Sequence, residues 1–190
     1  MNLSPNNFKV GVIPTLALLI ALSFQSAIAA VSEDDVKLVL LYKIARFVDW
    51  PQQPMDVTFN LCVIGKRTHK AAKERLSGRN VDGRPLRAKL LEASDDASGC
   101  DALYISESER PDISSLVAKF SGVPALTVSD APQFSRQGGM VELTTQDSRI
   151  GMTINVAAYQ RAGLKINSQL LEISRLIDHQ RVPESDGELP

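Results

Sequence analysis

Histidines are the first residues to consider for catalysis, because a serine hydrolase needs a general base beside its nucleophile. The sequence has two, His69 and His179, and it contains no G-x-S-x-G nucleophile motif. His69 lies in a charged helix start and His179 lies near the C-terminus, so we interpret both as surface residues. No group of residues has the spacing of a zinc site, and no glycine-rich phosphate-binding loop is present. We therefore expect a protein that is not an enzyme and that needs no metal and no cofactor.

Carboxylates that follow predicted strands are the next candidates. Asp130 comes directly after an apolar run, where open α/β sheets place their ligands. An Asp in front of Ala-Pro is also typical of a helix N-cap, and we favour that interpretation. Glu107 and Glu109 follow another strand, in a polar loop. A pocket near Ser106, Ser129 and Asp130 would indicate a small-ligand sensor, which is our alternative function.

The first thirty residues have the order of a secretory signal peptide. Lys9 precedes an apolar run over 10–24, and Ala27-Ile28-Ala29 forms a small-residue cleavage site. The alternative is an uncleaved membrane anchor, but the run contains Pro14 and is shorter than the roughly 20 residues that span a bilayer. We predict export to the periplasm with cleavage after Ala29.

Removal of residues 1–29 from the 190-residue chain leaves 161 residues, with Lys9 as the only charge lost. The remaining 20 basic and 22 acidic side chains give a net charge of −2, which argues against nucleic-acid binding. We divide the chain into a signal peptide over 1–29, one α/β domain over 30–182 and a disordered polar tail over 183–190.

Cys62 and Cys100 both lie in the exported part, where disulfides persist. An even number of cysteines in that compartment favours one disulfide. The alternative is two buried thiols that behave as small apolar side chains.

Strand and helix patterns alternate along the exported part. This alternation predicts a mainly parallel sheet with helices on both faces and an antiparallel hairpin at one edge. The expected strands cover 59–64, 85–91, 102–105 and 125–128, and the hairpin covers 140–154. The expected helices begin at Ser32, Thr68, Asp112, Asn155 and Asn167 or Ser168, the last with Ile166, Leu170, Ile173 and Ile177 on one face, and Asp130 begins a single helical turn.

Two segments are candidates for contact with a partner. The first helix is apolar around more than one face, so Phe47 and Trp50 near its end could meet a partner or a second copy. The alternative is a helix packed between a sheet and another helix. Gly138 and Gly139 allow close approach of the backbone, and Met140 and Met152 would suit an adaptable surface beside them. The alternative there is a tight turn into an edge strand.

The order of these segments resembles the YfiR-like family of periplasmic proteins, from about Asp35 to His179. The matching stretches are Leu41-Tyr42-Lys43-Ile44-Ala45-Arg46-Phe47-Val48-Asp49-Trp50-Pro51, Leu61-Cys62-Val63-Ile64-Gly65, Val81-Asp82-Gly83-Arg84-Pro85-Leu86, Cys100 before Leu103-Tyr104-Ile105-Ser106, Leu126-Thr127-Val128-Ser129-Asp130, Phe134, Gly138-Gly139-Met140, Ile154-Asn155 and Ala162-Gly163-Leu164-Lys165-Ile166.

The resemblance implies a Rossmann-like α/β sandwich and a non-enzymatic repressor of an inner-membrane diguanylate cyclase, which would lower cyclic di-GMP and biofilm formation. It also implies a Cys62–Cys100 disulfide. The implied partners are the periplasmic sensor domain of the cyclase, an OmpA-like outer-membrane lipoprotein and a second copy of the chain. The family's second cysteine pair has no counterpart here, and its usual Cys-His and Phe-Glu-Ile-Asn are replaced by Cys100-Asp101 and Met152-Thr153-Ile154-Asn155.

Overall fold

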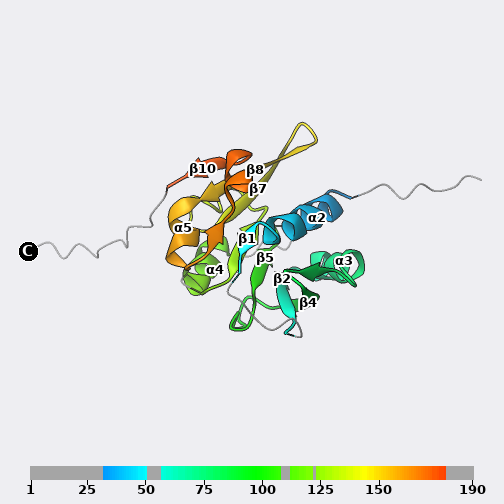
Figure 1. Cartoon of the computed structure of the whole chain (residues 1–190). Helices are drawn as coiled ribbons and strands as arrows, with labels where there is room; N and C mark the ends of the chain where they lie inside the picture. The colour runs from blue at the N-terminus through cyan, green and yellow to red at the C-terminus, as the bar shows by residue number, and fades with distance from the viewer. Residues whose placement is uncertain (1–31, 51–56, 108–111, 122, 179–190) are drawn as a thin grey trace, which may run out of the picture. The chain divides into compact units, whose positions relative to one another are not determined.

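The fold is a curled, mainly parallel sheet with helices on both faces (Figure 1). The computed structural model describes residues 32–50, 57–107, 112–121 and 123–178. The predicted signal peptide, the predicted tail, Glu109 and His179 lie outside these residues. In chain order the described elements are α2 (Glu33–Ala45), β1 (Val48–Asp49), β2 (Phe59–Ile64), α3 (Lys66–Arg75), β3 (Asn80–Val81), β4 (Arg84–Leu91), β5 (Ala102–Ile105), α4 (Ile113–Phe120), β6 (Leu126–Ser129), β7 (Val141–Gln146), β8 (Arg149–Asn155), α5 (Val156–Arg161), β9 (Lys165–Ile166), α6 (Ser168–Glu172) and β10 (Arg175–Ile177).

The main sheet has the strand order β10-β8-β7-β6-β5-β2-β4-β3. Strands β4, β2, β5, β6 and β7 run parallel, and β8 returns antiparallel to β7. The chain goes from β2 to β4 on one side and then continues from β5 on the other side of β2. The predicted class of fold is therefore confirmed. Two short strands, β1 and β9, form a separate antiparallel pair.

Alternate residues of the central strands pack against different layers. Leu61 and Val63 of β2 join the larger apolar cluster, which contains the buried residues of α2 and α3. Cys62 and Ile64 join the smaller cluster, which contains the buried residues of α4. The central strands thus read as continuous apolar runs because both faces of the sheet are covered.

The first helix begins as predicted. The hydroxyl of Ser32 accepts the Asp35 N–H at 3.1 Å, and the Asp35 carboxylate accepts the Ser32 N–H at 3.3 Å, which is a capping box. The apolar pattern predicted a helix continuing into Val48, but α2 ends at Ala45 because the chain then pairs with β9. No helix in the described residues is long and apolar enough to cross a membrane.

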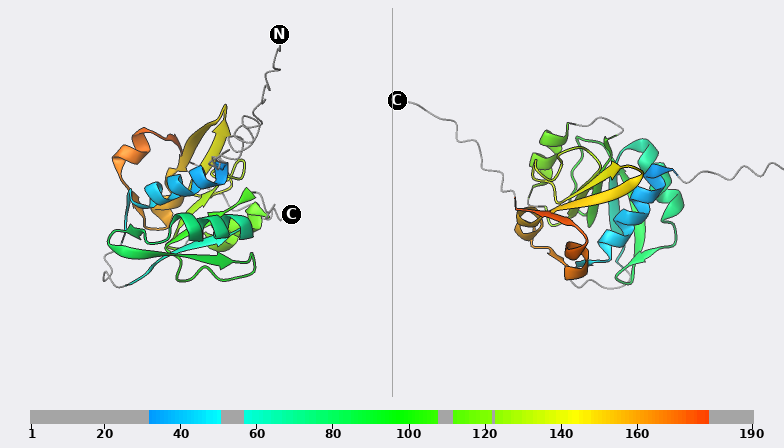
Figure 2. Two further views of the ribbon diagram at one scale, coloured as in Figure 1. Left: turned by 90° about the vertical axis from the view of Figure 1, so that its right-hand side faces the viewer. Right: turned by 90° about the horizontal axis from the view of Figure 1, so that it is seen from above.

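The predicted hairpin is also present. Asp147 and Ser148 connect β7 to β8 with φ values of 50° and 59°, as a two-residue hairpin turn requires. The strands extend past the end of β6, and Figure 2 shows the hairpin reaching toward the N-terminal end of α2. The hairpin is not the edge of the sheet, because β10 pairs with the outer side of β8.

Two helix predictions need correction. Thr68 does not cap α3, because the helix begins at Lys66 after Gly65, whose φ of 133° suits only glycine. The last predicted helix stops at Glu172, and β10 follows it. The apolar face expected there contains Ile173, which is 76% exposed, so a longer helix would bury little on that side. Pairing with β8 satisfies the backbone instead.

Candidate functional site

Polar side chains from four distant segments meet at the carboxyl end of β6. We call Glu33, Lys37, Glu107, Asp130 and Thr145 the strand-end cluster. The Lys37 ammonium lies 2.8 Å from the Asp130 carboxylate and 2.7 Å from the Glu33 carboxylate. The Thr145 hydroxyl donates to Glu33 at 2.7 Å, and the Glu107 N–H donates to Asp130 at 2.8 Å. The cluster therefore ties α2 to the ends of β5 and β6 and to the hairpin.

Asp130 is not the helix cap that its sequence context predicts. Residues 131–137 form turns without a helix, and the Ala131 N–H donates to the Ser129 hydroxyl at 3.0 Å. The Asp130 side chain instead neutralises Lys37, and both side chains are buried. The predicted N-cap at Asp130 is therefore wrong, and the side chain forms a long-range ion pair that leaves no local pattern in the sequence.

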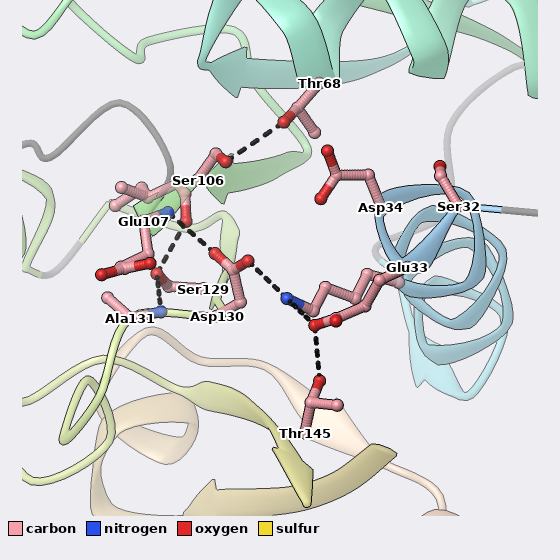
Figure 3. Close-up of polar contacts among 12 residues, drawn as sticks. Ser32, Glu33, Asp34, Thr68, Ser106, Glu107, Ser129, Asp130, Ala131 and Thr145 are labelled. Atoms are coloured by element: carbon pink, nitrogen blue, oxygen red, sulfur yellow. Dashed lines mark hydrogen bonds and ion pairs between the residues drawn. The ribbon is translucent and has the colours of Figure 1, made fainter. Parts of the chain in front are cut away.

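The serines at the strand ends serve the fold. Ser129 donates to the Ile105 carbonyl at 2.7 Å, and the hydroxyls of Thr68 and Ser106 lie 3.1 Å apart (Figure 3). All three side chains are buried. The sequence correctly brings Ser106, Ser129 and Asp130 to one edge of the sheet, but the two serines face the interior.

A surface hollow of about 320 Å³ lies beside the strand-end cluster. Its lining includes Glu33, Lys37, Glu107, Asp130 and Glu142. Glu142 is already engaged, because it accepts the Gln133 N–H, the Ser135 N–H and the Ser135 hydroxyl. In the described residues no group of His, Cys, Asp and Glu has the arrangement of a metal site.

The charges of the cluster shift several pKa values. The hydrogen bond from Lys37, and then that from Thr145, lower the pKa of Glu33. Hydrogen bonds from Arg75 lower the pKa of Asp35 in the same helix turn. Burial opposes the charged form of Lys37, but its bonds to Asp130 and Glu33 outweigh that effect and raise its pKa. Burial, and then the charge of Asp130, raise the pKa of the Tyr104 hydroxyl beneath the cluster.

We expect the stability of the protein to fall at both ends of the pH range. Lowered pKa values mean that Glu33 and Asp35 stabilise the fold above about pH 4 and lose that contribution as the pH falls through those values. The raised pKa of Lys37 has the opposite sign, so its contribution is present below about pH 10 and is lost above it. The urea concentration at the midpoint of unfolding, measured from acid to alkaline pH, shows the loss of stability at each end of the range. The variant Lys37→Met should lack the part of the fall in stability at alkaline pH that deprotonation of Lys37 causes. The same fall in the variant and the wild type would contradict this assignment.

The predicted partner contacts at the end of α2 differ in exposure. Trp50 is 9% exposed, and its indole N–H donates to the Ala45 carbonyl at 2.7 Å. Its ring also meets the Phe59 ring edge to face, with centroids 5.0 Å apart. Phe47 is half-buried against the larger apolar cluster. Phe47 is thus the more exposed member of this pair, and its contact with a partner stays a prediction.

Gly138, Gly139, Met140 and Met152 also differ in exposure. Met140 is 4% exposed, and its N–H donates to the Thr127 hydroxyl at 3.1 Å. Gly139 is buried, Gly138 and Met152 are half-buried, and a cavity of about 20 Å³, enough for one water, lies beside the pair. An acidic side chain at Met140 would place a charge in the core, so a Met140→Asp variant would test folding and not binding.

The glycine pair is required by close packing. A Cβ at Gly139 would overlap the ring of Phe134, which is fully buried. We expect Gly139→Ala to lower the free energy of unfolding by about 1–3 kcal/mol, because the Phe134 ring and its buried neighbours must shift to admit the new methyl group. Gly151→Ala is the matched control, since its Cβ would lie 3.0 Å from the movable hydroxyl of exposed Thr144 and at an ordinary contact distance of 3.8 Å from the Thr144 carbonyl oxygen. Equal urea midpoints for the two variants would refute the packing argument.

The chain is similar to proteins of one known family. A family model described as YfiR/HmsC-like matches residues 34–175. The chain belongs to this family. A search of curated proteins finds no match. Among solved structures, a conserved domain protein from Vibrio cholerae O1 biovar eltor matches with a TM-score of 0.54 and 12% identity. The match covers 76% of this chain and 60% of that protein, and at this identity it is a likeness of fold.

The disulfide of this YfiR/HmsC-like chain is present as predicted. Cys62 in β2 joins Cys100 in the loop before β5, with Cα atoms 5.8 Å apart. Asp101, which stands where the family resemblance expects histidine, accepts the Asn60 N–H and forms an ion pair of 2.8 Å with buried Arg84. The carboxylate therefore has a structural role next to the disulfide.

Sequence reasoning missed Lys37 in this YfiR/HmsC-like chain. A signal for it exists, because Lys37, Leu41 and Ile44 share one helical face, and Leu41 and Ile44 are apolar. A lysine on the core face of a helix needs a buried acidic partner. The sequence does not say which of its acids that partner is.

Proposed function

We propose that the protein is a periplasmic regulator that binds the periplasmic sensor domain of an inner-membrane diguanylate cyclase. It holds the cyclase inactive, and so lowers cyclic di-GMP and biofilm formation. Membership of the YfiR/HmsC-like family, over residues 34–175, is the observation that carries this proposal. We also propose cleavage after Ala29, a domain over 30–182 with a tail over 183–190, an OmpA-like outer-membrane lipoprotein as a second partner, and a homodimer.

The described geometry supports a binding role. Glu33, Lys37 and Asp130 of the strand-end cluster are engaged with one another, so their first role is to hold α2 against the sheet. A repressor needs no catalysis. It must bind the inactive cyclase more tightly than the active one, because equal affinity for both would shift nothing.

Cellular cyclic di-GMP tests the function. We expect its level to rise when the gene is deleted and to return when the full-length gene is restored. A gene that lacks codons 1–29 should not restore it, because the product would stay in the cytoplasm. Deletion without any rise in cyclic di-GMP, or full rescue by the form without a leader, would overturn the proposal.

We expect the substitution Met152→Glu to weaken binding to the cyclase sensor domain at least tenfold, if Met152 lies at the contact, since a charge would have to be buried there. Met152 is half-buried on β8 and packs against the larger apolar cluster, so a thermal melt must first show that the variant is folded. Val57→Glu is the matched control, because Val57 is an exposed apolar residue before β2. Titration of the purified sensor domain measures both variants. Equal affinities would remove Met152 from the contact.

The alternative, a small-ligand sensor, has one observation in its favour. The hollow of about 320 Å³ lies at the carboxyl end of the parallel strands, where such sheets bind ligands. A ligand that binds only the native state raises the melting temperature. A shift in Tm with a small metabolite, removed by Asp130→Asn, would favour this alternative.

A further inference from the structure

Strand β4 leaves most of its outer side unpaired among the described residues. On the inner side β2 pairs with it over 86–91. On the outer side β3 pairs only with Arg84 and Pro85, and the Leu86 N–H then donates to the Arg79 carbonyl. The rest of the strand therefore forms one edge of the main sheet.

This edge offers backbone donors and acceptors to a further strand. The N–H and C=O groups of alternate residues point to the same side of a strand. Because the Leu86 N–H points outward, the groups of Ala88 and Leu90 point outward as well. No strand among the described residues pairs with them there. The sheet can therefore accept one more strand at β4, which is the geometry of β-augmentation.

The edge lacks several features that close the edges of other sheets. Short length, a proline or a bulge prevents pairing with another chain. Strand β4 has eight residues, its proline lies in the part that β3 covers, and its register with β2 continues over 86–91 without a bulge. The strand at the opposite end of the sheet, β10, has only three residues. Strand β4 thus offers the longer free edge.

The two faces of the edge differ in chemistry. Leu86 and Ala88 pack against the larger apolar cluster, and Leu90 on the same face is 37% exposed. Arg87 and Lys89 alternate with these residues, so they point to the opposite face, and both are exposed. A strand that fits this edge has apolar side chains on one face and anionic side chains on the other.

A groove of about 180 Å³ lies on the apolar side of the edge, between α3 and β4. Its lining includes the apolar residues Ala72, Leu76, Leu86 and Ala88, together with Lys73. In β-augmentation, pockets beside the sheet edge receive alternate side chains of the added strand. The groove is placed to receive an apolar side chain of such a strand.

The positive charge of the edge is not neutralised by the part of the chain that the structure describes. Arg87 and Lys89 form no ion pair there. Asp101 lies close to the neighbouring strand, where it accepts the Asn60 N–H, but its ion pair is with Arg84. Strand β4 itself contains no acid. The edge therefore favours a strand of opposite charge.

A second copy of the chain does not fit the edge. If two copies paired antiparallel through β4 about Ala88, Arg87 of one copy would lie opposite Lys89 of the other. Like charges that lie directly opposite one another destabilise a pair of strands. The two cations thus oppose self-association and select an acidic partner.

We propose that the free edge of β4 binds an extended segment of a partner protein in which acidic and apolar side chains alternate. The backbone of the segment pairs with Ala88 and Leu90. Its acidic side chains face Arg87 and Lys89, and one of its apolar side chains enters the groove beside α3. This surface shares no residue with the strand-end cluster, and docking there does not require that the partner is a cyclase.

Amide NMR of the ¹⁵N-labelled chain from Ala30 onward tests the proposal, because one compact unit begins at Ser32 and contains both apolar clusters. The ligand in the titration is the peptide acetyl-Val-Glu-Val-Glu-Val-Glu-Val-amide. The amide signals of Ala88 and Leu90 should shift, and these amides should exchange more slowly with solvent deuterium. The same peptide with Lys in place of Glu should leave them unchanged.

Three results of this titration would overturn the proposal. The first is the absence of any change over 86–91. The second is an equal response to the Glu and Lys peptides. The third is a response of β10 in place of β4, because the peptide would then add to the opposite edge of the sheet.

Charge reversal tests the preference for an acidic strand. The double variant Arg87→Glu, Lys89→Glu should bind the Glu peptide about tenfold more weakly and should bind the Lys peptide instead, because the cross-strand charge pairs change sign. The matched control is Arg149→Glu, Lys165→Glu, which makes the same change of charge at exposed positions on β8 and β9. It should bind as the wild type does. Equal losses in the two variants would mean that net charge alone matters, which overturns the proposal.

The variant Ala88→Pro tests the backbone pairing. It removes an N–H that points outward, so the hydrogen bonds between β4 and β2 remain. We expect it to bind the Glu peptide about tenfold more weakly, whereas Ala88→Ser, which keeps the N–H, should bind normally. Thermal melts show which variants are folded, and the charge-reversed variant decides if Ala88→Pro does not fold. Binding by folded Ala88→Pro that is as tight as wild-type binding would overturn the proposal.

Discussion

The double variant Cys62→Ala, Cys100→Ala should have a free energy of unfolding about 4 kcal/mol lower than that of the oxidised protein. The disulfide closes a loop with a sequence separation of 38 residues, and the chain-entropy relation gives this value for such a loop. Cys62 is fully buried, and both cysteines belong to the smaller apolar cluster, so the native state also holds the bridge in packed surroundings. Equilibrium unfolding in urea measures the difference.

The wild-type protein in excess reductant is the control for lost packing. It keeps both sulfur atoms but lacks the bridge, so its midpoint should lie near that of the double alanine variant. Thiol titration of the denatured, unreduced protein should find no free thiol. Two free thiols, or equal midpoints for the oxidised and reduced protein, would contradict the expected stabilisation.

The variant Lys37→Met should lose about 3 kcal/mol of unfolding free energy. Lys37 and Asp130 are both buried, and removal of the lysine charge leaves the Asp130 carboxylate beside Glu33 without a cation between them. An uncompensated buried charge carries a cost of this size. Methionine keeps the length of the side chain, so the loss reports charge more than packing. Urea midpoints measure it.

Two further variants make this test specific. Lys43→Met changes an exposed lysine in the last turn of the same helix and should have little effect. The double variant Lys37→Met, Asp130→Asn should recover much of the loss, because it leaves no buried carboxylate at position 130 and an amide can still accept the Glu107 N–H. If the double variant is less stable than either single variant, the buried charge does not cause the loss.

The sequence predicts those elements whose signals are local. The capping box at Ser32, the N-cap at Asp112, the hairpin turn at Asp147 and Ser148, and the N-cap at Asn155 all depend on residues within four positions of one another. The continuous apolar runs of β2, β5 and β6 likewise reveal strands buried on both faces.

The failures have long-range causes. Asp130 looks like a helix cap in its own segment, and only the position of Lys37, 93 residues away, makes it half of an ion pair. Strand β10 looks like the end of a helix, and only the free edge of β8 makes it a strand. Trp50 and Met140 are buried, which the sequence does not show because aromatic and methionine side chains occur both in cores and at interfaces, and their contact with a partner stays a prediction. Local patterns cannot separate these cases.

The fastening of α2 has a consequence for the order of folding. Its contacts to Asp130 and Thr145 span 93 and 112 residues, so the helix can pack against α3 early in synthesis but cannot complete these contacts until β6 and β7 exist. Contacts of such separation delay the rate-limiting step of folding. A nascent chain would therefore remain incompletely folded until its C-terminal half was made.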